Sequence, residues 1–237
     1  MRAKYGYLAG VAVIAFSSFL YAGDITGTVK FEGTAPHMKP IDMAKEPVCQ
    51  KEHNPPVTIQ AVVAGPNNTL ENVLVYVSKG LPAGKTYPAP SQPVTFDQKG
   101  CMYGPHVAAL QVNQDFKVTN SDPVAHNIHP LAKVNSEWNK SQPPGAGPID
   151  AKFDKPELVI PVKCNIHPWM RGYIAVLDHP FYSVSDANGK FTIKGLPPGH
   201  YTITAWQESW GNQTAEVDVP ASGAKTVDLT FKARPVY

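Results

Sequence analysis

The sequence has little surplus charge and few of the motifs that mark common enzymes. Its 237 residues hold 21 Lys and Arg against 19 Asp and Glu. This balance gives no support for nucleic-acid binding, which needs a basic face. We find no Gly-x-Ser-x-Gly elbow, His-Glu-x-x-His pair, haem-attaching Cys-x-x-Cys-His or phosphate-binding glycine loop. Long amphipathic helical patterns are also missing beyond the N-terminal segment. We therefore expect a protein that is not an enzyme.

The N-terminus carries the one long apolar run. Arg2 and Lys4 precede the uncharged stretch Tyr5–Leu20, which ends in small residues at Ala22. This order predicts a secretory signal peptide over residues 1–22, cleaved after Ala22. The alternative is a retained anchor, since about 17 to 25 apolar residues can span a bilayer. With cleavage, we expect a soluble periplasmic or secreted protein without a membrane span.

Proline and glycine are spread through the rest of the chain, and this pattern predicts an all-β fold. There are 24 Pro and 18 Gly, with short runs rich in Val, Thr, Tyr and Phe between them. A Pro-rich stretch, residues 81–93, indicates a boundary, and an Asn188-Gly189 turn predicts a hairpin. The expected strands are Asp24–Glu32, Val57–Ala64, Asn72–Ser78, Val107–Val112, Asp115–Asn120, His126–His129, Glu157–Lys163, Gly172–Leu177, Thr214–Val219 and Lys225–Phe231.

The chain has only three cysteines, so a single disulfide leaves one thiol. Cys49 and Cys101 lie in turn-rich stretches without ligand spacing, which favours a disulfide between them in an oxidising compartment. Two separate buried thiols are the alternative. Cys164 differs because other metal-binding residue types surround it.

Residues 162–176, VKCNIHPWMRGYIAV, place Cys164, His167 and Met170 in a Cys-x-x-His-x-x-Met pattern. Thiolate, imidazole and thioether in one short loop are soft ligands suited to copper. Upstream, VAHNIHP offers His126 or His129 as a second imidazole. Residues three apart on a strand face opposite sides, so both histidines reach one metal only across a bulge.

The two motifs, His-Asn-x-His and CNIHPWMRG, resemble those of small blue-copper cupredoxins, amicyanin and plastocyanin among them. The resemblance implies one mononuclear type 1 copper ion. It also selects His126 as the fourth ligand beside Cys164, His167 and Met170, because Asn127 follows it and would tie the two ligand segments together.

The position of Trp169 beside the solvent-side ligand suggests that redox protein partners dock beside the copper loop. Pro168 and Trp169 would form part of this apolar patch. The alternatives are purely structural roles, in which Met170 fills the core and Trp169 only packs against its neighbours. His106 is expected to be an uninvolved loop residue, and His37, His53, His179 and His200 are expected at the surface.

A second resemblance joins the flanking segments. SDANGKFTIKGLPPGHYTI and VDLTF are similar to carboxypeptidase regulatory-like (transthyretin-like) modules, whose opening strands resemble ITGTVKFEG and VLVYVS. We therefore expect a discontinuous, prealbumin-like β-sandwich from residues 23–93 and 179–237. A cupredoxin-like Greek-key β-sandwich, residues 94–178, would be inserted into it or packed beside it.

Together these features predict an exported type 1 copper protein that carries single electrons between redox partners outside the cytoplasm. Two alternatives come from other classes. Cys and His ligands also suit structural zinc or non-redox copper handling, although a Met ligand argues against zinc. A cell-envelope binding scaffold has only fold analogy behind it.

Overall fold

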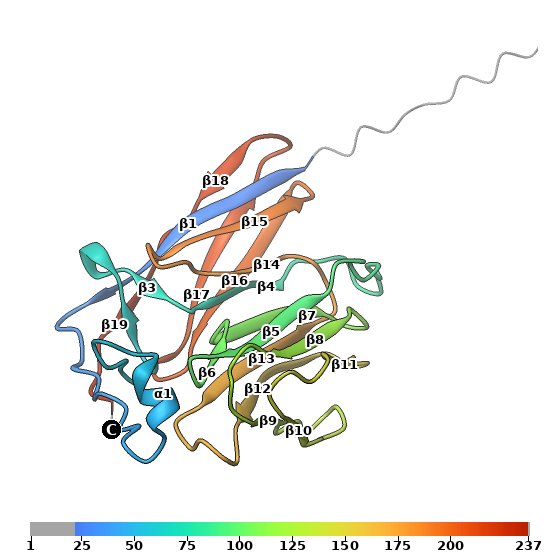
Figure 1. Ribbon diagram of the computed structural model, residues 1–237. Helices are drawn as coiled ribbons and strands as arrows, with labels where there is room; N and C mark the ends of the chain where they lie inside the picture. Colours follow the sequence, from blue (N-terminus) through green and yellow to red (C-terminus); the bar gives the residue numbers. More distant parts are fainter. Residues whose placement is uncertain (1–21, 237) are drawn as a thin grey trace, which may run out of the picture.

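The computed structural model describes residues 22–236, which form two units built almost wholly of β-strands (Figure 1). Residues 1–21 of the predicted signal peptide lie outside the described part of the chain. Within the described part, no helix has the length and apolar character needed to cross a bilayer. The expectation of an all-β protein is confirmed.

The first unit is a sandwich of two sheets made from both ends of the chain. One sheet has the order β15-β1-β18, with β19 also pairing with β1, and the other has the order β14-β4-β16-β17. Its strands are β1 (Gly23–Glu32), β4 (Leu74–Lys79), β14 (Tyr182–Val184), β15 (Lys190–Leu196), β16 (Gly199–Gln207), β17 (Gly211–Val219), β18 (Ala224–Thr226) and β19 (Leu229–Lys232).

Alternation along β1 explains how this sandwich forms. Ile25, Val29 and Phe31 point into the core, while Thr26 and Lys30 are less buried. The Asn188-Gly189 turn is present, and Gly189 takes a φ of 69° that suits glycine. However, the strands that it joins, β14 and β15, lie in different sheets, so the predicted hairpin is wrong.

The second unit is formed by the continuous segment between these two parts. Its sheets have the orders β10-β9-β12-β13-β7 and β11-β8-β5-β6, and aromatic and aliphatic side chains fill the space between them. The strands are β5 (Val94–Lys99), β6 (Met102–Gly104), β7 (Val107–Gln111), β8 (Phe116–Asn120), β9 (His126–Pro130), β10 (Lys140–Gln142), β11 (Ile149–Ala151), β12 (Glu157–Lys163) and β13 (Arg171–Leu177).

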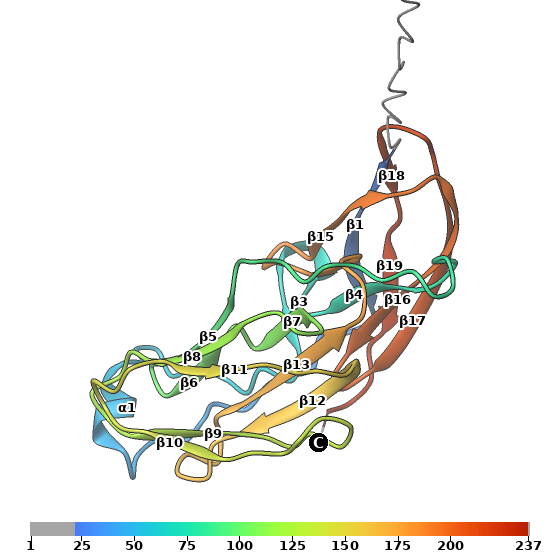
Figure 2. The same cartoon turned by 90° about the vertical axis from the view of Figure 1, so that its right-hand side faces the viewer.

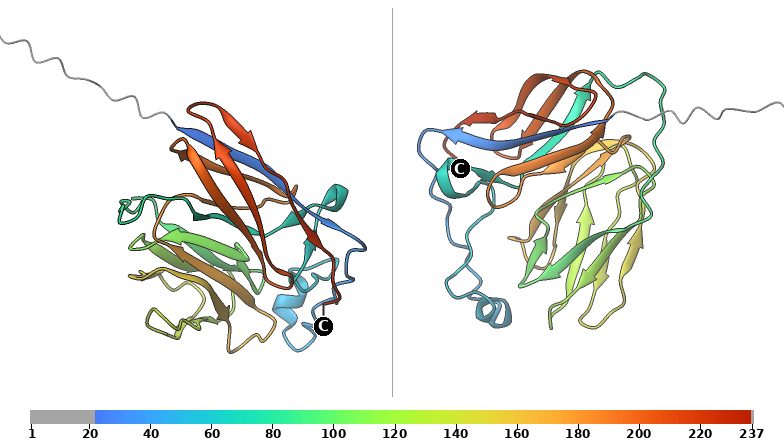
Figure 3. Two further views of the ribbon diagram at one scale, coloured as in Figure 1. Left: turned by 180° about the vertical axis from the view of Figure 1, so that it is seen from behind. Right: turned by 90° about the horizontal axis from the view of Figure 1, so that it is seen from above.

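The two units pack through β4 and β14 of the first and β7 and β13 of the second (Figure 3). Leu74, Val107, Ala175 and Leu177 form a small buried cluster between them. Beside it, His106 Nε2 lies 3.2 Å from a carboxylate oxygen of Glu208. His106 therefore links the units, whereas the sequence suggested an uninvolved loop residue.

The segment between β1 and β4 reaches across to the second unit. It contains α1 (Pro47–Lys51), β2 (Val63–Ala64), the 3-10 turn η1 (Pro66–Asn68) and β3 (Leu70–Glu71). Figure 2 shows α1 at one end of the second unit, near β6. We refer to residues 39–59, which include α1, as the cap.

Only the last two residues of the strand predicted at Val57–Ala64 form a strand, β2, because its first part is folded into the cap. Only an isolated bridge joins Thr58 to Pro40. The N–H of Ile41 donates to the carbonyl oxygen of Val57 at 2.9 Å and the N–H of Ile59 to that of Lys39 at 3.0 Å, so the pairing spans only these few residues.

Candidate metal centre

The Cys-x-x-His-x-x-Met loop joins β12 to β13 and closes on itself. The N–H of Cys164 donates to the carbonyl oxygen of Met170 at 3.1 Å, and the N–H of Met170 donates to that of His167 at 2.9 Å. Lys163 and Arg171, which flank the loop, are paired in the sheet. The loop therefore presents the three predicted ligands from one end of the second unit.

The predicted second imidazole meets this loop. Nδ1 of His126 lies 2.9 Å from Nδ1 of His167, and Cys164 Sγ lies 3.9 Å from His167 Nδ1. His126, Cys164 and His167 each offer a donor atom within 4.8 Å of the other two. All three side chains are buried, and Met170 is buried in the same core cluster.

His129 does not join this group. Its Nε2 lies 2.6 Å from a carboxylate oxygen of Glu137, which is half exposed. The period-2 alternation of β9 explains this difference, because His126 and His129 face opposite sides of the strand.

Asn127 connects the two ligand segments. Its Oδ1 accepts a hydrogen bond from the backbone N–H of Asn165 at 2.6 Å and lies 3.3 Å from Cys164 Sγ. Contacts of this kind orient ligands before a metal binds.

Asp122 is a further residue of the site, and the sequence reasoning missed it. Its carboxylate accepts hydrogen bonds from His126 Nε2 at 2.7 Å and from the backbone N–H groups of Gly100 at 2.6 Å and Cys101 at 2.7 Å. The carboxylate fixes the ring of His126 so that Nδ1 faces His167. An Asp four residues before a predicted ligand histidine was the available signal.

Burial, hydrogen bonds and neighbouring charges shift the pKa values of all three candidate ligands. Burial acts to lower the pKa of His126, but hydrogen bonds to Asp122 and Cys164 outweigh it and raise the pKa. Burial acts to raise the pKa of Cys164, but the hydrogen bond with His126 and nearby backbone N–H groups lower it. The pKa of His167 is lowered by burial and by the charge of His126. The arrangement therefore favours a thiolate beside neutral His167.

The disulfide between Cys49 and Cys101 is confirmed, with an S–S distance of 2.07 Å. It lies against the candidate centre, since Cys49 Sγ is 3.9 Å from His167 Nε2. Trp169 Nε1 donates to the carbonyl oxygen of Cys101 at 3.1 Å. The cap consequently covers His167, which is only 1% exposed.

The predicted partner patch is partly covered as well. Trp169 is half-buried, while Pro168 is exposed.

The donor atoms are spaced for a single metal ion. Two imidazole nitrogens on one tetrahedral ion lie about 3.3 Å apart, and an imidazole nitrogen and a thiolate about 3.6 Å apart. The corresponding distances here are 2.9 Å and 3.9 Å. The two distances from His167 thus lie within a few tenths of an ångström of those on one ion, and all three donor atoms lie within 4.8 Å of one another, so the residues fit a copper or zinc ion.

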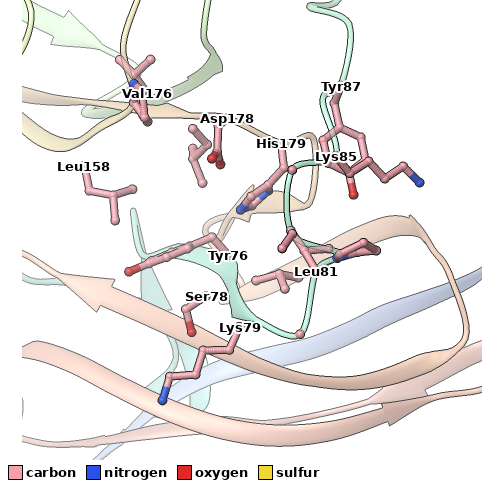
Figure 4. Close-up of a pocket in the computed structure, with 17 residues that line it drawn as sticks. Tyr76, Ser78, Lys79, Leu81, Lys85, Tyr87, Leu158, Val176, Asp178 and His179 are labelled. Carbon is pink, nitrogen blue, oxygen red and sulfur yellow. The ribbon is translucent and has the colours of Figure 1, made fainter.

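Away from the candidate centre, a cleft with a volume of about 390 Å³ lies between the two units. Figure 4 shows Tyr76, Asp178 and His179 around it. None of the predicted ligands lines it. His179 is buried there rather than at the surface as expected, and its Nδ1 accepts a hydrogen bond from the N–H of Phe181.

A comparison with protein families matches one part of the expectation. The family model of the carboxypeptidase regulatory-like domain matches residues 174–232, from within β13 to the end of β19. This stretch of the chain thus resembles that domain, as expected. No curated protein matches the sequence.

Three solved structures are similar to part of this chain. A copper-containing nitrite reductase from Thermus scotoductus SA-01 is 20% identical, with a TM-score of 0.35, over 43% of this chain and 26% of that chain. A purple cupredoxin from Nitrosopumilus maritimus is 21% identical, with a TM-score of 0.30, over 35% of this chain and 98% of that chain. A reduced amicyanin mutant is 19% identical, with a TM-score of 0.32, over 43% of this chain and 97% of that chain.

Proposed function

We propose that the protein is an exported carrier of single electrons that holds one mononuclear type 1 copper ion. The observation that supports this most strongly is the convergence of His126 Nδ1, His167 Nδ1 and Cys164 Sγ within 4.8 Å of one another. Met170 would add a weak axial thioether. A bound copper ion would supply a one-electron couple, and this mixture of donors suits both Cu(I) and Cu(II).

The burial of the donors favours electron transfer over catalysis. His126, His167 and Cys164 are 0%, 1% and 3% exposed. Catalytic metal sites keep a coordination position open to water or substrate. Here the cap covers His167, and Asn127 and Asp122 hold the ligand segments in place. Such a site can change oxidation state with little movement.

The surface beside the loop offers a place for redox protein partners. Ile166 is 47% exposed, and Pro168 is exposed next to His167. A small apolar patch of this kind suits brief contacts with other redox proteins. The disulfide agrees with a periplasmic or secreted protein, because disulfides persist in oxidising compartments.

The visible absorption spectrum of the Cu²⁺-loaded protein tests the proposal. We expect an intense thiolate-to-copper charge-transfer band that Cys164→Ser and His126→Gln both remove. His129→Gln is the matched control, since it lies on the same strand but bonds to Glu137, and it should keep the band. A colourless protein that takes up only zinc would favour the non-redox alternative.

A further inference from the structure

A second set of metal-binding atoms lies behind the two candidate imidazoles. The sulfurs of Cys49 and Cys101 and a ring nitrogen of His167 all lie within 4.8 Å of one another. The nitrogen nearest the disulfide is Nε2, 3.9 Å from Cys49 Sγ. Nδ1 of the same ring points the other way, towards His126. His167 therefore stands between two groups of donors.

We propose that Cys49, Cys101 and His167 Nε2 form a second metal site when the disulfide is reduced. The site would take a thiophilic closed-shell ion, Cu(I) or Zn²⁺, because two thiolates and an imidazole are the ligands such ions prefer. It does not depend on copper at the first centre.

The spacing supports this assignment. A thiolate and an imidazole nitrogen on one tetrahedral ion lie about 3.6 Å apart, close to the 3.9 Å between Cys49 Sγ and His167 Nε2. The two sulfurs need to separate to about 3.8 Å to share an ion. Cys49 is on the short helix α1 in the cap, and Cys101 is in the turn between β5 and β6. Neither sulfur is held within a strand.

A fourth donor is also close. Cys101, Asp122 and His126 form another group whose donor atoms all lie within 4.8 Å of one another. The Asp122 carboxylate, 4% exposed, therefore lies beside Cys101, one of the two sulfurs of the second site.

Formation of the site needs a reductant, for which we name a dithiol. The dithiol gives two electrons and two protons to the bond between Cys49 and Cys101, which breaks to two thiols, and the dithiol closes to its own disulfide. Metal binding then releases the two thiol protons, since thiolates are the ligands.

The redox state of Cys49 and Cys101 would decide which of the two metal sites His167 joins. A neutral imidazole has one free lone pair, on either Nδ1 or Nε2. While the disulfide is intact, the lone pair of Nδ1 is available to a metal ion held by Cys164 and His126. After reduction, the thiolates compete for the same ring through Nε2.

Cadmium titration of a Cys164→Ser variant tests this inference separately from the proposed function. The oxidised variant has no thiol, because the two remaining cysteines are paired. Any thiolate-to-metal absorption after treatment with dithiothreitol and its anaerobic removal must therefore come from Cys49 and Cys101. We expect one Cd²⁺ per chain in the reduced variant and no such absorption in the oxidised one.

Two further substitutions in the same background complete the test. His167→Leu should weaken Cd²⁺ binding by at least about tenfold, since even outer contacts are worth that much at metal sites. His200→Asn is the control, because His200 lies between Glu216 and Asp218 at the surface and could hold Cd²⁺ adventitiously. It should leave the titration unchanged. Cys49 and Cys101 that resist reduction in the folded protein, as alkylation with iodoacetamide would show, overturn the proposal. So does a reduced variant without thiolate absorption.

Discussion

Asp122 offers the sharpest perturbation of the candidate centre. Its carboxylate is 4% exposed and accepts three hydrogen bonds, from His126 Nε2 and from the backbone N–H groups of Gly100 and Cys101. Asp122→Ala leaves these three donors without a partner. Removing one member of a buried ion pair costs about 3 to 5 kcal/mol. We therefore expect the free energy of unfolding of the metal-free protein to fall by about that amount at neutral pH.

The same substitution should weaken metal binding. His126 would lose the contact that fixes its ring, and loss of such an outer contact costs about 10-fold to 100-fold in metal affinity. Asp122→Asn should recover part of the stability, because its amide oxygen still accepts from the backbone. Urea denaturation of the metal-free proteins and a chelator competition for copper measure the two effects. Unchanged stability and copper affinity in Asp122→Ala would refute the role given to this carboxylate.

Three other predictions follow from the structure. Met170→Leu should keep copper but change the reduction potential, because the axial ligand tunes the centre and does not anchor it; complete loss of copper in metal analysis would contradict this. Replacing both Cys49 and Cys101 with Ser should lower the free energy of unfolding by about 4 kcal/mol in the chain-entropy model, since the disulfide spans a sequence separation of 52; equal urea midpoints would contradict it. Burial acts to raise the pKa of Glu157, but hydrogen bonds from the 133–135 loop lower it. This carboxylate therefore stabilises the fold above its unfolded pKa, and the contribution is lost as pH falls through the lower folded pKa. Glu157→Gln should be less stable than the parent near neutral pH, with the difference closing in acid; a difference independent of pH would contradict this.

The fold was predictable where local pattern and tertiary packing agree. Strand β1 buries Ile25, Val29 and Phe31 as its sequence indicates, and the apolar run of β13 is buried on both sides. The Cys49–Cys101 disulfide followed from the number and context of the cysteines. Misplaced elements depended on contacts outside their own segment. Thr58 forms an isolated bridge to Pro40, which no local propensity reveals.

In the candidate site, too, local pattern predicted some residues, while contacts with other segments determined the rest. The Cys-x-x-His-x-x-Met spacing located one loop, and strand alternation separated His126 from His129. The burial of His167 was not predictable, because the cap that covers it comes from a segment more than a hundred residues earlier. The contact of Asp122 with His126 depends on how the turn between β8 and β9 folds, and their four-residue spacing alone does not determine that shape.

X-ray absorption at the copper edge of the Cu²⁺-loaded protein tests most directly whether His126, Cys164 and His167 converge on one ion. We predict a first coordination shell of two imidazole nitrogens and one short thiolate sulfur, with the sulfur lost in Cys164→Ser. A shell of nitrogen and oxygen alone in the parent protein would contradict the account.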